Sequence, residues 1–379
     1  MCEQPWRWNL DYVVDPHGNA VSYYYQPEYN YYGLNKNITT PGTRYTSGGY
    51  ALRMEYGLRQ TKDGNGNNTV YGSAPTNRVV FNTDYRCTPS NGYDCKSAPT
   101  SDLDHAMNWP DTPTDGICDD KKACLYGAPS FFTTHQLTSI ESQYNKDGKF
   151  ADLDRWDLSQ SFKPTGDALA RPLWLDGIQH TGFGTDGSSI QLPPTTFKAQ
   201  SYANRIDTVG DAYAPLKRNR IIEINNETGG KTGITYTSEI DTQPGGCVAG
   251  HTPANPETDT MRCYAVWWTP TGAADPIMDW FRKYVVTDVT QYDNTGGNLP
   301  QVTHYDYLGD TAWHYDEGQF TPPKRRTWGQ WRGYGLVRTT VGDTKLTTSV
   351  SETLYFRGMD GDTLPSDGVR HPDPVVDSD

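Results

Sequence analysis

The sequence has no long apolar run and few hydrophobic residues. Only 35% of its 379 residues are hydrophobic, and no stretch reaches the roughly 20 apolar residues that a membrane-spanning helix needs. Basic residues are also scarce, because 33 Lys and Arg stand against 46 Asp and Glu, a formal net charge of -13. Such a balance repels a phosphate backbone. We therefore expect no nucleic-acid partner and no membrane-spanning segment.

Most sequence signatures of enzymes are missing as well. The chain has no G-x-S-x-G nucleophile elbow, no G-x-x-x-x-G-K-[ST] phosphate loop and no G-x-G-x-x-G opening a helix. Its eight His residues form no H-x-x-x-H or H-E-x-x-H pattern, and no C-x-x-C occurs, so the usual zinc and redox motifs are absent. The sequence therefore predicts no catalytic residue, no metal site and no cofactor.

Two acidic stretches come near calcium-binding chemistry. The run 63–67 begins like an EF-hand loop, but Asn68 and Ala74 stand where that loop needs its glycine and its bidentate glutamate. A flexible hairpin tip is the favoured interpretation. The alternating acids of 152–157 lie two apart on one face of an expected strand. Two interpretations of these acids remain open: solvated side chains on a strand, or a surface calcium site.

Tyrosine, tryptophan, glycine and proline are abundant. The 26 Tyr and 11 Trp suit broad sheets, and the 37 Gly and 26 Pro supply turns and argue against long helices. One hairpin pattern recurs at 12–25, 220–236 and 284–307: a short apolar strand, a polar Asp/Asn/Gly turn and a Tyr-rich strand. The pattern predicts an all-β protein, a large curved antiparallel sheet of consecutive hairpins with open edges.

Individual residues and further elements follow from this pattern. The glycines and the asparagine expected at turns or bends are Gly18, Asn19, Gly230, Gly297, Gly333 and Gly335. The tyrosines expected on strand faces are Tyr23, Tyr25, Tyr236, Tyr305 and Tyr307. Further strands are expected at 50–56, 78–81, 136–142, 154–162, 174–180, 192–197, 335–341 and 353–356. A short helix is expected at 102–107 and a helical turn at 278–284.

Six of the seven cysteines fall in three local couples. The couples are Cys87 with Cys95, Cys118 with Cys124, and Cys247 with Cys263, and each brackets a loop rich in Pro, Gly or Asp. Three small-loop disulfides in an oxidising compartment are the favoured interpretation, and free buried thiols are the alternative. Local pairing is the simplest of the fifteen connectivities that six cysteines allow. Cys2 is left over for a partner outside the chain.

The chain is expected to form one segment from residue 1 to 364, followed by a flexible tail or linker at 365–379. Residues 86–130 interrupt the hairpins and are expected to be an insertion pinned by two disulfides. Residues ahead of the first hairpin are not expected to be a signal peptide. A disulfide-bearing chain of this kind is expected to be a piece of a longer exported protein.

Several segments together resemble one family. Residues 8–12, the turn 15–19 and the tyrosines 23–25 resemble the "D-x-H-G-N … Y-x-Y" hairpin of the insecticidal Tc toxin B component. Residues 219–236 resemble its "R-L-x-x-I … G … Y" hairpin, and 313–337 resemble its "Y-x-D-G … F-R-G-F-G-x-V" segment. Residues 354–362 are similar to the continuation in secreted actinobacterial Rhs (YD-repeat) proteins. The resemblance covers about 6–363, and the cysteine loops 86–130 and 238–263 depart toward the Rhs branch.

The resemblance implies a function. In such proteins, strands spiral into a hollow shell that encloses a C-terminal toxic polypeptide. The implied role is a non-catalytic shell segment of a secreted bacterial protein. Its implied partners are the rest of the same polypeptide, the enclosed toxin and a target-cell surface.

Two other functions remain as alternatives. The tryptophans at 267–268 and at 328 and 331 could stack on sugars, which would fit a secreted carbohydrate-binding module or glycoside hydrolase. Buried sheet aromatics are the competing interpretation of the same residues. An adhesion scaffold that displays the loop 86–130 is the third possibility.

Overall fold

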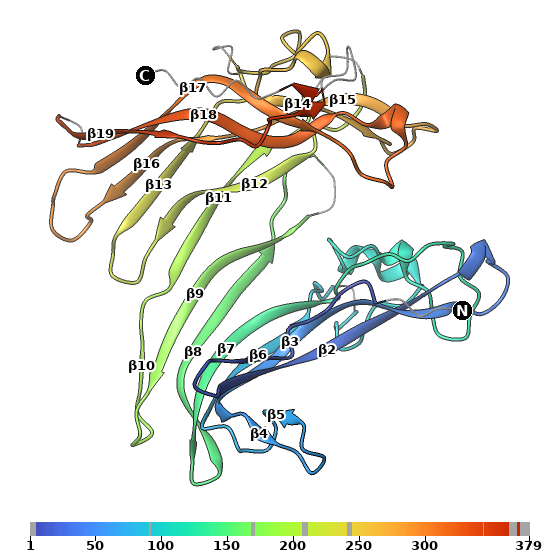
Figure 1. Ribbon diagram of the computed structural model, residues 1–379, viewed down its shortest axis with the longest axis vertical. Helices are drawn as coiled ribbons and strands as arrows, with labels where there is room; N and C mark the ends of the chain where they lie inside the picture. The colour runs from blue at the N-terminus through green and yellow to red at the C-terminus, as the bar shows by residue number, and fades with distance from the viewer. Residues whose placement is uncertain are drawn as a thin grey trace. The chain divides into compact units, whose positions relative to one another are not determined.

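The computed structural model describes residues 5–90, 92–167, 171–206, 211–240, 245–343, 345–363 and 370–371 (Figure 1). Cys2 and most of the expected tail, 365–369 and 372–379, lie outside the described residues. The chain packs as two compact units. No helix in the described part is long and apolar enough to cross a lipid bilayer.

Unit 1 comprises Met1–Lys163 and Ala170–Thr195. Its strands are β1 (Tyr12–Val14), β2 (Asn19–Tyr32), β3 (Thr43–Arg59), β4 (Thr61–Lys62), β5 (Asn68–Thr69), β6 (Asn77–Tyr85), β7 (His135–Lys146), β8 (Lys149–Phe162), β9 (Leu173–Phe183) and β10 (Ser189–Gln191). Its short 3-10 helices are η1 (Leu34–Lys36), η2 (Leu103–Asn108) and η3 (Thr114–Gly116). The helix expected at 102–107 corresponds to η2.

Unit 2 comprises Pro164–Leu169 and Thr196–Asp379. Its strands are β11 (Thr195–Ala203), β12 (Lys217–Asn225), β13 (Lys231–Tyr236), β14 (Cys263–Trp268), β15 (Ile277–Arg282), β16 (Val286–Tyr292), β17 (Gln301–Tyr315), β18 (Trp328–Gly342), β19 (Thr347–Leu354), β20 (Asp362–Thr363) and β21 (Arg370–His371). Its 3-10 helices are η4 (Pro256–Thr258) and η5 (Pro323–Arg325).

Most strands belong to one 15-stranded antiparallel sheet. Its order is β1-β2-β3-β6-β7-β8-β9-β11-β12-β13-β16-β17-β18-β19, with β10 paired to β9. Neighbours in the sheet are mostly neighbours in the chain, as a succession of hairpins requires. β1 and β19 end the order without pairing to each other, so the sheet is not closed into a barrel. The predicted all-β, open-edged antiparallel sheet is confirmed.

The hairpin turns share one local chemistry. In the β1–β2 turn the Asp15 carboxylate accepts hydrogen bonds from the backbone N–H groups of His17 and Asn19, both at 2.8 Å, and Gly18 has φ +79°. In the β12–β13 turn the Asn226 side-chain oxygen accepts from the N–H groups two and four residues later, and Gly229 has φ +89°. An Asp or Asn stands at the first position of the turn because its side-chain oxygen accepts backbone N–H groups that have no carbonyl partner there. Glycine occupies the position that needs a left-handed backbone conformation.

Few strand residues are buried. All nine residues of β12 are half-buried, and β6, β8, β13 and β16 contain no buried residue. In a two-layer β fold, alternate residues of a strand are buried against the second layer. The buried hydrophobic clusters of the described residues are one in unit 1 (Ala20, Leu58, Val70) and one in unit 2 (Ile206, Cys247, Cys263). These strands thus keep both faces partly open.

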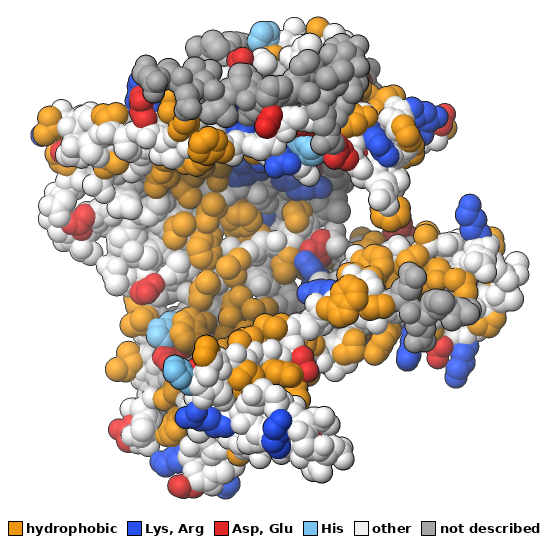
Figure 2. Space-filling view, viewed as in Figure 1, with side chains coloured by type: hydrophobic (Ala, Val, Ile, Leu, Met, Phe, Trp, Pro, Cys, Tyr) orange, Lys and Arg blue, Asp and Glu red, His pale blue; other side chains and the backbone are white. Residues whose placement is uncertain are grey.

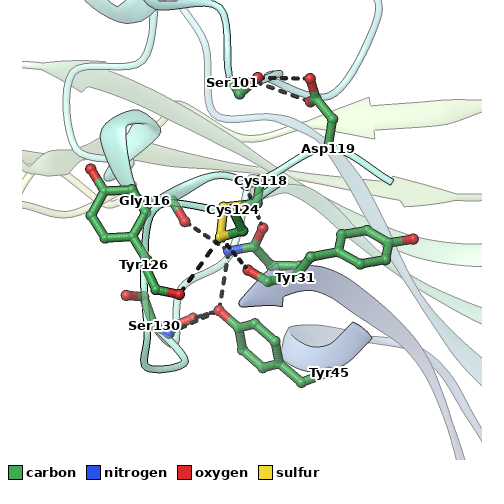
Figure 3. The surroundings of a disulfide bond; sticks show 10 residues. Tyr31, Tyr45, Ser101, Gly116, Cys118, Asp119, Cys124, Tyr126 and Ser130 are labelled. Carbon is green, nitrogen blue, oxygen red and sulfur yellow. Dashed lines mark hydrogen bonds between the residues drawn. A yellow bond between two sulfur atoms is a disulfide. The ribbon is translucent and has the colours of Figure 1, made fainter. Parts of the chain in front are cut away.

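The insertion 86–130 is held against β2 and β3 in unit 1. The Asn30 amide donates to the Gly116 carbonyl at 2.9 Å and accepts from the Cys118 N–H at 3.0 Å. The Tyr45 hydroxyl donates to the Ser130 carbonyl at 2.5 Å, beside the Cys118–Cys124 disulfide (Figure 3). These contacts connect an irregular loop to the strands, so the disulfides are not its only support.

Three expectations differ from the structure. Residues 278–284 are not a helical turn, because Ile277–Arg282 form β15 and pair with β14. Gly333 and Gly335 lie inside β18 rather than in a turn. Both occur where the β17–β18 register shifts, and Gly333 has φ +83°, so they accompany irregular pairing within a strand. Residues 192–194 precede β11, which begins at Thr195.

Candidate functional site

A group of cationic and aromatic side chains gathers in unit 2. We call it the cation–aromatic face, and it consists of Tyr202 on β11, Arg220 on β12, Tyr236 on β13, Lys283 and Tyr284 directly after β15, and Trp331 and Tyr334 on β18. Figure 2 shows Lys and Arg side chains gathered beside hydrophobic side chains in the upper part of the view.

Arg220 is stacked on tyrosine rings. Its guanidinium carbon lies 4.5 Å from the ring centroid of Tyr284 and 6.0 Å from that of Tyr202. The Tyr202 ring meets Tyr236 and Tyr284 edge-on, at centroid distances of 5.8 and 5.2 Å. One Nη of Arg220 donates to the side-chain oxygen of Asn204 at 2.8 Å. Cation–π stacking therefore fixes the guanidinium plane.

Lys283 lies close to the same positive charge. Its Nζ is 5.6 Å from the ring centroid of Trp331. Burial, and then the charge of Arg220, lowers the pKa of Lys283. The ion pairs found in the described part of the chain involve neither Lys283 nor Arg220. The charge of Arg220 thus acts on Lys283, and neither cation forms an ion pair in the described part of the chain.

A small polar pocket adjoins Lys283. It has a volume of about 10 Å³ and is lined by Thr237, Ser238, Gly246, Cys247, Arg262, Arg282, Lys283 and Tyr284, which suits one water-sized group. Arg282 donates to the backbone carbonyls of Cys247 and Arg205, at 3.1 and 2.9 Å. Arg262 donates to the Tyr334 hydroxyl at 3.1 Å. Donors predominate around this pocket, so an anionic oxygen matches its chemistry.

A larger groove lies beside β14. Its volume is about 590 Å³, and its lining includes Trp267, Phe320, Arg325 and Gln330. The Trp267 side chain is exposed there, at 37%. The other tryptophans considered for sugar stacking are more enclosed, because Trp328 is buried and Trp331 packs against Trp313 and Tyr334. The groove therefore offers one open tryptophan rather than a platform of four.

Asp259, in the loop before β14, carries a perturbed carboxyl group. One carboxylate oxygen accepts the Met261 N–H at 2.7 Å, and the other is buried with no hydrogen-bond partner. Burial raises the pKa of Asp259 to about 7, although the Met261 N–H lowers it. The folded chain therefore holds a proton that the unfolded chain releases near pH 4. Folding stability contributed by this group is complete below pH 4 and is lost as the pH rises to about 7.

Asp259→Asn should remove this pH dependence. The amide keeps an oxygen for the Met261 N–H and carries no charge. The difference in unfolding free energy between the variant and the native chain should shift by about 2 kcal/mol in favour of the variant from pH 5 to pH 8. Urea unfolding at the two pH values measures the gap, and Asp310→Asn at an exposed position is the matched control. A gap that stays constant with pH would refute the assignment.

The structure places the residues selected from the sequence as follows. Disulfides join Cys87 to Cys95, Cys118 to Cys124 and Cys247 to Cys263. Gly18 and Gly297 have positive φ in hairpin turns, and Asn19 donates both its backbone and its side-chain N–H to Asp15. In the β12–β13 turn the left-handed residue is Gly229, and the N–H of the next residue, Gly230, donates to the Asn226 side-chain oxygen. In the described chain no group of three or more His, Cys, Asp or Glu is arranged to hold a metal.

Sequence reasoning did not find the cation–aromatic face. Its members come from five separate parts of the chain, between residues 202 and 334, and none belongs to a motif. A signal existed nonetheless, because Arg282 and Lys283 are adjacent cations between aromatic residues in an acidic chain. Reading 278–284 as helical concealed it.

Comparison with known proteins returned only structural similarity. No family model and no curated protein matches the chain. A crystal structure of TcdB2-TccC3 covers 92% of this chain and 20% of its own, with 11% identity and a TM-score of 0.29. The structure of the Tc holotoxin pore of Photorhabdus luminescens matches 91% of this chain and 16% of its own chain, with 12% identity and a TM-score of 0.29. A crystal structure of TcdB2-TccC3 without its hypervariable C-terminal region matches 92% of this chain and 19% of its own chain, with 12% identity and a TM-score of 0.31.

This chain spans about a fifth of the length of those structures or less. All three TM-scores lie below 0.5. The description of the fold accordingly rests on the strand pairing of this chain and not on these neighbours.

Proposed function

We propose that this chain is a non-catalytic segment of a β-sheet shell in a secreted Rhs/Tc-like toxin, and that it helps to enclose a C-terminal toxin polypeptide. The observation that carries the proposal is the scarcity of buried residues on strands that have a paired neighbour on each side. β12 and β8, for example, pair on both sides and contain no buried residue. A paired strand with two half-open faces suits a wall between two compartments better than the core of a globule.

The sequence pattern supports the same role. The hairpins that resemble Tc toxin B segments lie at β1–β2, at β12–β13 and from the end of β17 into β18. Three disulfides are consistent with an extracellular location, because such bonds persist in oxidising compartments. The partners in this proposal are the remainder of the longer polypeptide, its enclosed toxin and, during delivery, a target-cell surface.

Open sheet edges provide a direct test. All eight residues of the edge strand β19 are exposed, and Val350 in it is 58% exposed. Because an uncovered edge templates further strand pairing, the isolated chain should associate as its concentration rises. Size-exclusion chromatography with light scattering should detect this association, and Val350→Lys should reduce it. Leu346→Lys is the control, since Leu346 is 66% exposed but lies outside β19.

The outcomes separate clearly. Association that falls with Val350→Lys and persists with Leu346→Lys supports a shell segment that needs a neighbour at this edge. A monodisperse monomer at all concentrations would contradict the proposal, because a wall segment with uncovered edges should not be self-sufficient.

A further inference from the structure

We infer that the cation–aromatic face of unit 2 binds an acidic polypeptide segment, whose carboxylates lie against Arg220 and Lys283. The inference rests on the proposed function, in which the chain meets a separate polypeptide, and it specifies the charge of the segment that this face takes. It is argued from the charge balance, the stacking geometry and the adjoining pocket.

The charge balance of this face is opposite to that of the chain. The whole chain has a formal net charge of -13. Two other cations of unit 2 have carboxylate partners, since Arg338 pairs with Glu352 at 2.7 Å and Lys198 with Glu223 at 2.5 Å. Arg220 and Lys283 instead contact aromatic rings and one amide oxygen. Two half-buried cations that form no ion pair in the described chain favour an incoming carboxylate, because part of their desolvation is already complete.

The geometry favours a carboxylate on a peptide over a free ion. Tyr284 holds the Arg220 guanidinium on its ring and Asn204 accepts from one Nη, which leaves the other Nη to donate to an incoming carboxylate. Trp331 and Tyr202 are half-buried beside the two cations and can pack apolar parts of a peptide. Aromatic anchors with arginine are the usual energetic centre of a protein interface.

The adjoining pocket adds a second position for an anionic oxygen. It is lined by Lys283, Arg262 and Arg282 together with the hydroxyl-bearing residues Thr237 and Ser238. Its small volume, about 10 Å³, admits a single oxygen-sized group and not a whole phosphate diester. A bound carboxylate also relieves the repulsion that Arg220 exerts on Lys283. Nucleic acid fits poorly, because its many phosphates meet the acidic remainder of the chain.

Peptide binding to the immobilised 379-residue chain tests the inference. The probe is a fluorescein-labelled peptide of alternating Glu and Tyr, and the same peptide with Gln in place of Glu is its uncharged match. The Glu peptide should bind at least about tenfold more tightly, which corresponds to one charge-assisted contact. Its affinity should fall as salt rises from 50 to 300 mM.

Variants locate the binding site. Arg220→Gln and Lys283→Gln should each weaken the Glu peptide by about tenfold, whereas Lys283→Arg should retain most of the binding. Lys345→Gln is the matched control, because Lys345 is an exposed cation of unit 2 outside the face. Near-ultraviolet circular dichroism verifies that each variant is folded. If Lys283→Gln is not folded, Lys283→Met takes its place, because the methionine side chain can still pack beside Trp331.

Three results would overturn the inference: equal affinity for the Glu and Gln peptides, equal effects of Lys283→Gln and Lys345→Gln, or tighter binding of a thymidine oligonucleotide than of the Glu peptide. Binding is measured on single immobilised chains, so it does not depend on strand association. Failure of peptide binding with intact Val350-dependent association would reject this inference alone. Failure of association with intact peptide binding would reject the shell proposal alone.

Discussion

Arg205→Met should destabilise unit 2 by about 3 to 5 kcal/mol, the largest effect we expect from a single substitution. Arg205 is 1% exposed and pairs with the carboxylates of Asp211 and Asp279. It also donates to the Tyr213 carbonyl at 3.1 Å. Removing the guanidinium leaves two carboxylates in a poorly solvated site, and methionine replaces only the volume of the side chain.

The position of Arg205 in the fold increases this effect. Its backbone forms an isolated bridge to Phe281 of β15, and its carbonyl accepts a hydrogen bond from Arg282 at 2.9 Å. Loss of the ion network should therefore loosen β15 and the residues that follow it, Lys283 and Tyr284. Unit 2 should lose its near-ultraviolet signal at lower urea concentration, and peptide binding should weaken with it.

A matched substitution separates burial from charge. Arg338→Met removes an exposed cation whose partner is Glu352, and the two side chains are 44% and 47% exposed. Because solvent screens such pairs, its effect should stay below about 1 kcal/mol. Adding Asp279→Asn to Arg205→Met should restore part of the lost stability, because one buried charge disappears. Equal midpoints of urea unfolding for Arg205→Met and Arg338→Met would refute the buried ion network.

The hairpins could be predicted from sequence because their determinants are local. Asp15 and Gly18 are three residues apart, and the hydrogen bonds that define the turn stay within five residues. The β12–β13 turn shows the limit of this reasoning. Two adjacent glycines look equivalent in sequence, but the side chain of Asn226 caps the N–H of Gly230 and leaves Gly229 in the left-handed position.

The candidate site could not be predicted because its determinants are distant. β15 pairs with β14, and the backbone of Phe281 forms a β-bridge with Arg205, 76 residues earlier in the chain. The local pattern at 278–284 shows no clear alternation of apolar and polar residues, so it does not identify a strand. Without β15 as a strand, the sequence gives no reason to place Lys283 beside Trp331.

The cysteines fall between these two cases. Each couple is close in sequence, at separations of 8, 6 and 16 residues, and the structure joins these same couples. Their environments differ in a way that sequence does not reveal. Cys247 and Cys263 are 5% and 0% exposed and form a hydrophobic cluster with Ile206, whereas Cys87 and Cys95 are half-buried.

Removing the Cys247–Cys263 disulfide should therefore cost more than removing the Cys87–Cys95 disulfide. The double variant Cys247→Ala/Cys263→Ala should lose about 3 kcal/mol of stability because the loop is no longer closed. It should lose further stability because removing the two sulfur atoms leaves the hydrophobic cluster less well packed. Cys87→Ala/Cys95→Ala releases a shorter loop at a half-buried place. Urea unfolding of both variants under oxidising conditions measures the difference.

The larger effect should extend to the candidate site. The Cys247 carbonyl accepts the Arg282 guanidinium at 3.1 Å, and Cys247 lines the pocket beside Lys283. Freeing Cys247 should thus weaken Glu-peptide binding, whereas freeing Cys87, which lies in unit 1, should leave it unchanged. Reducing the native chain opens all three disulfides, so it should weaken Glu-peptide binding as the Cys247→Ala/Cys263→Ala variant does. Equal stability losses in the two variants would mean that burial of this disulfide contributes nothing beyond loop closure.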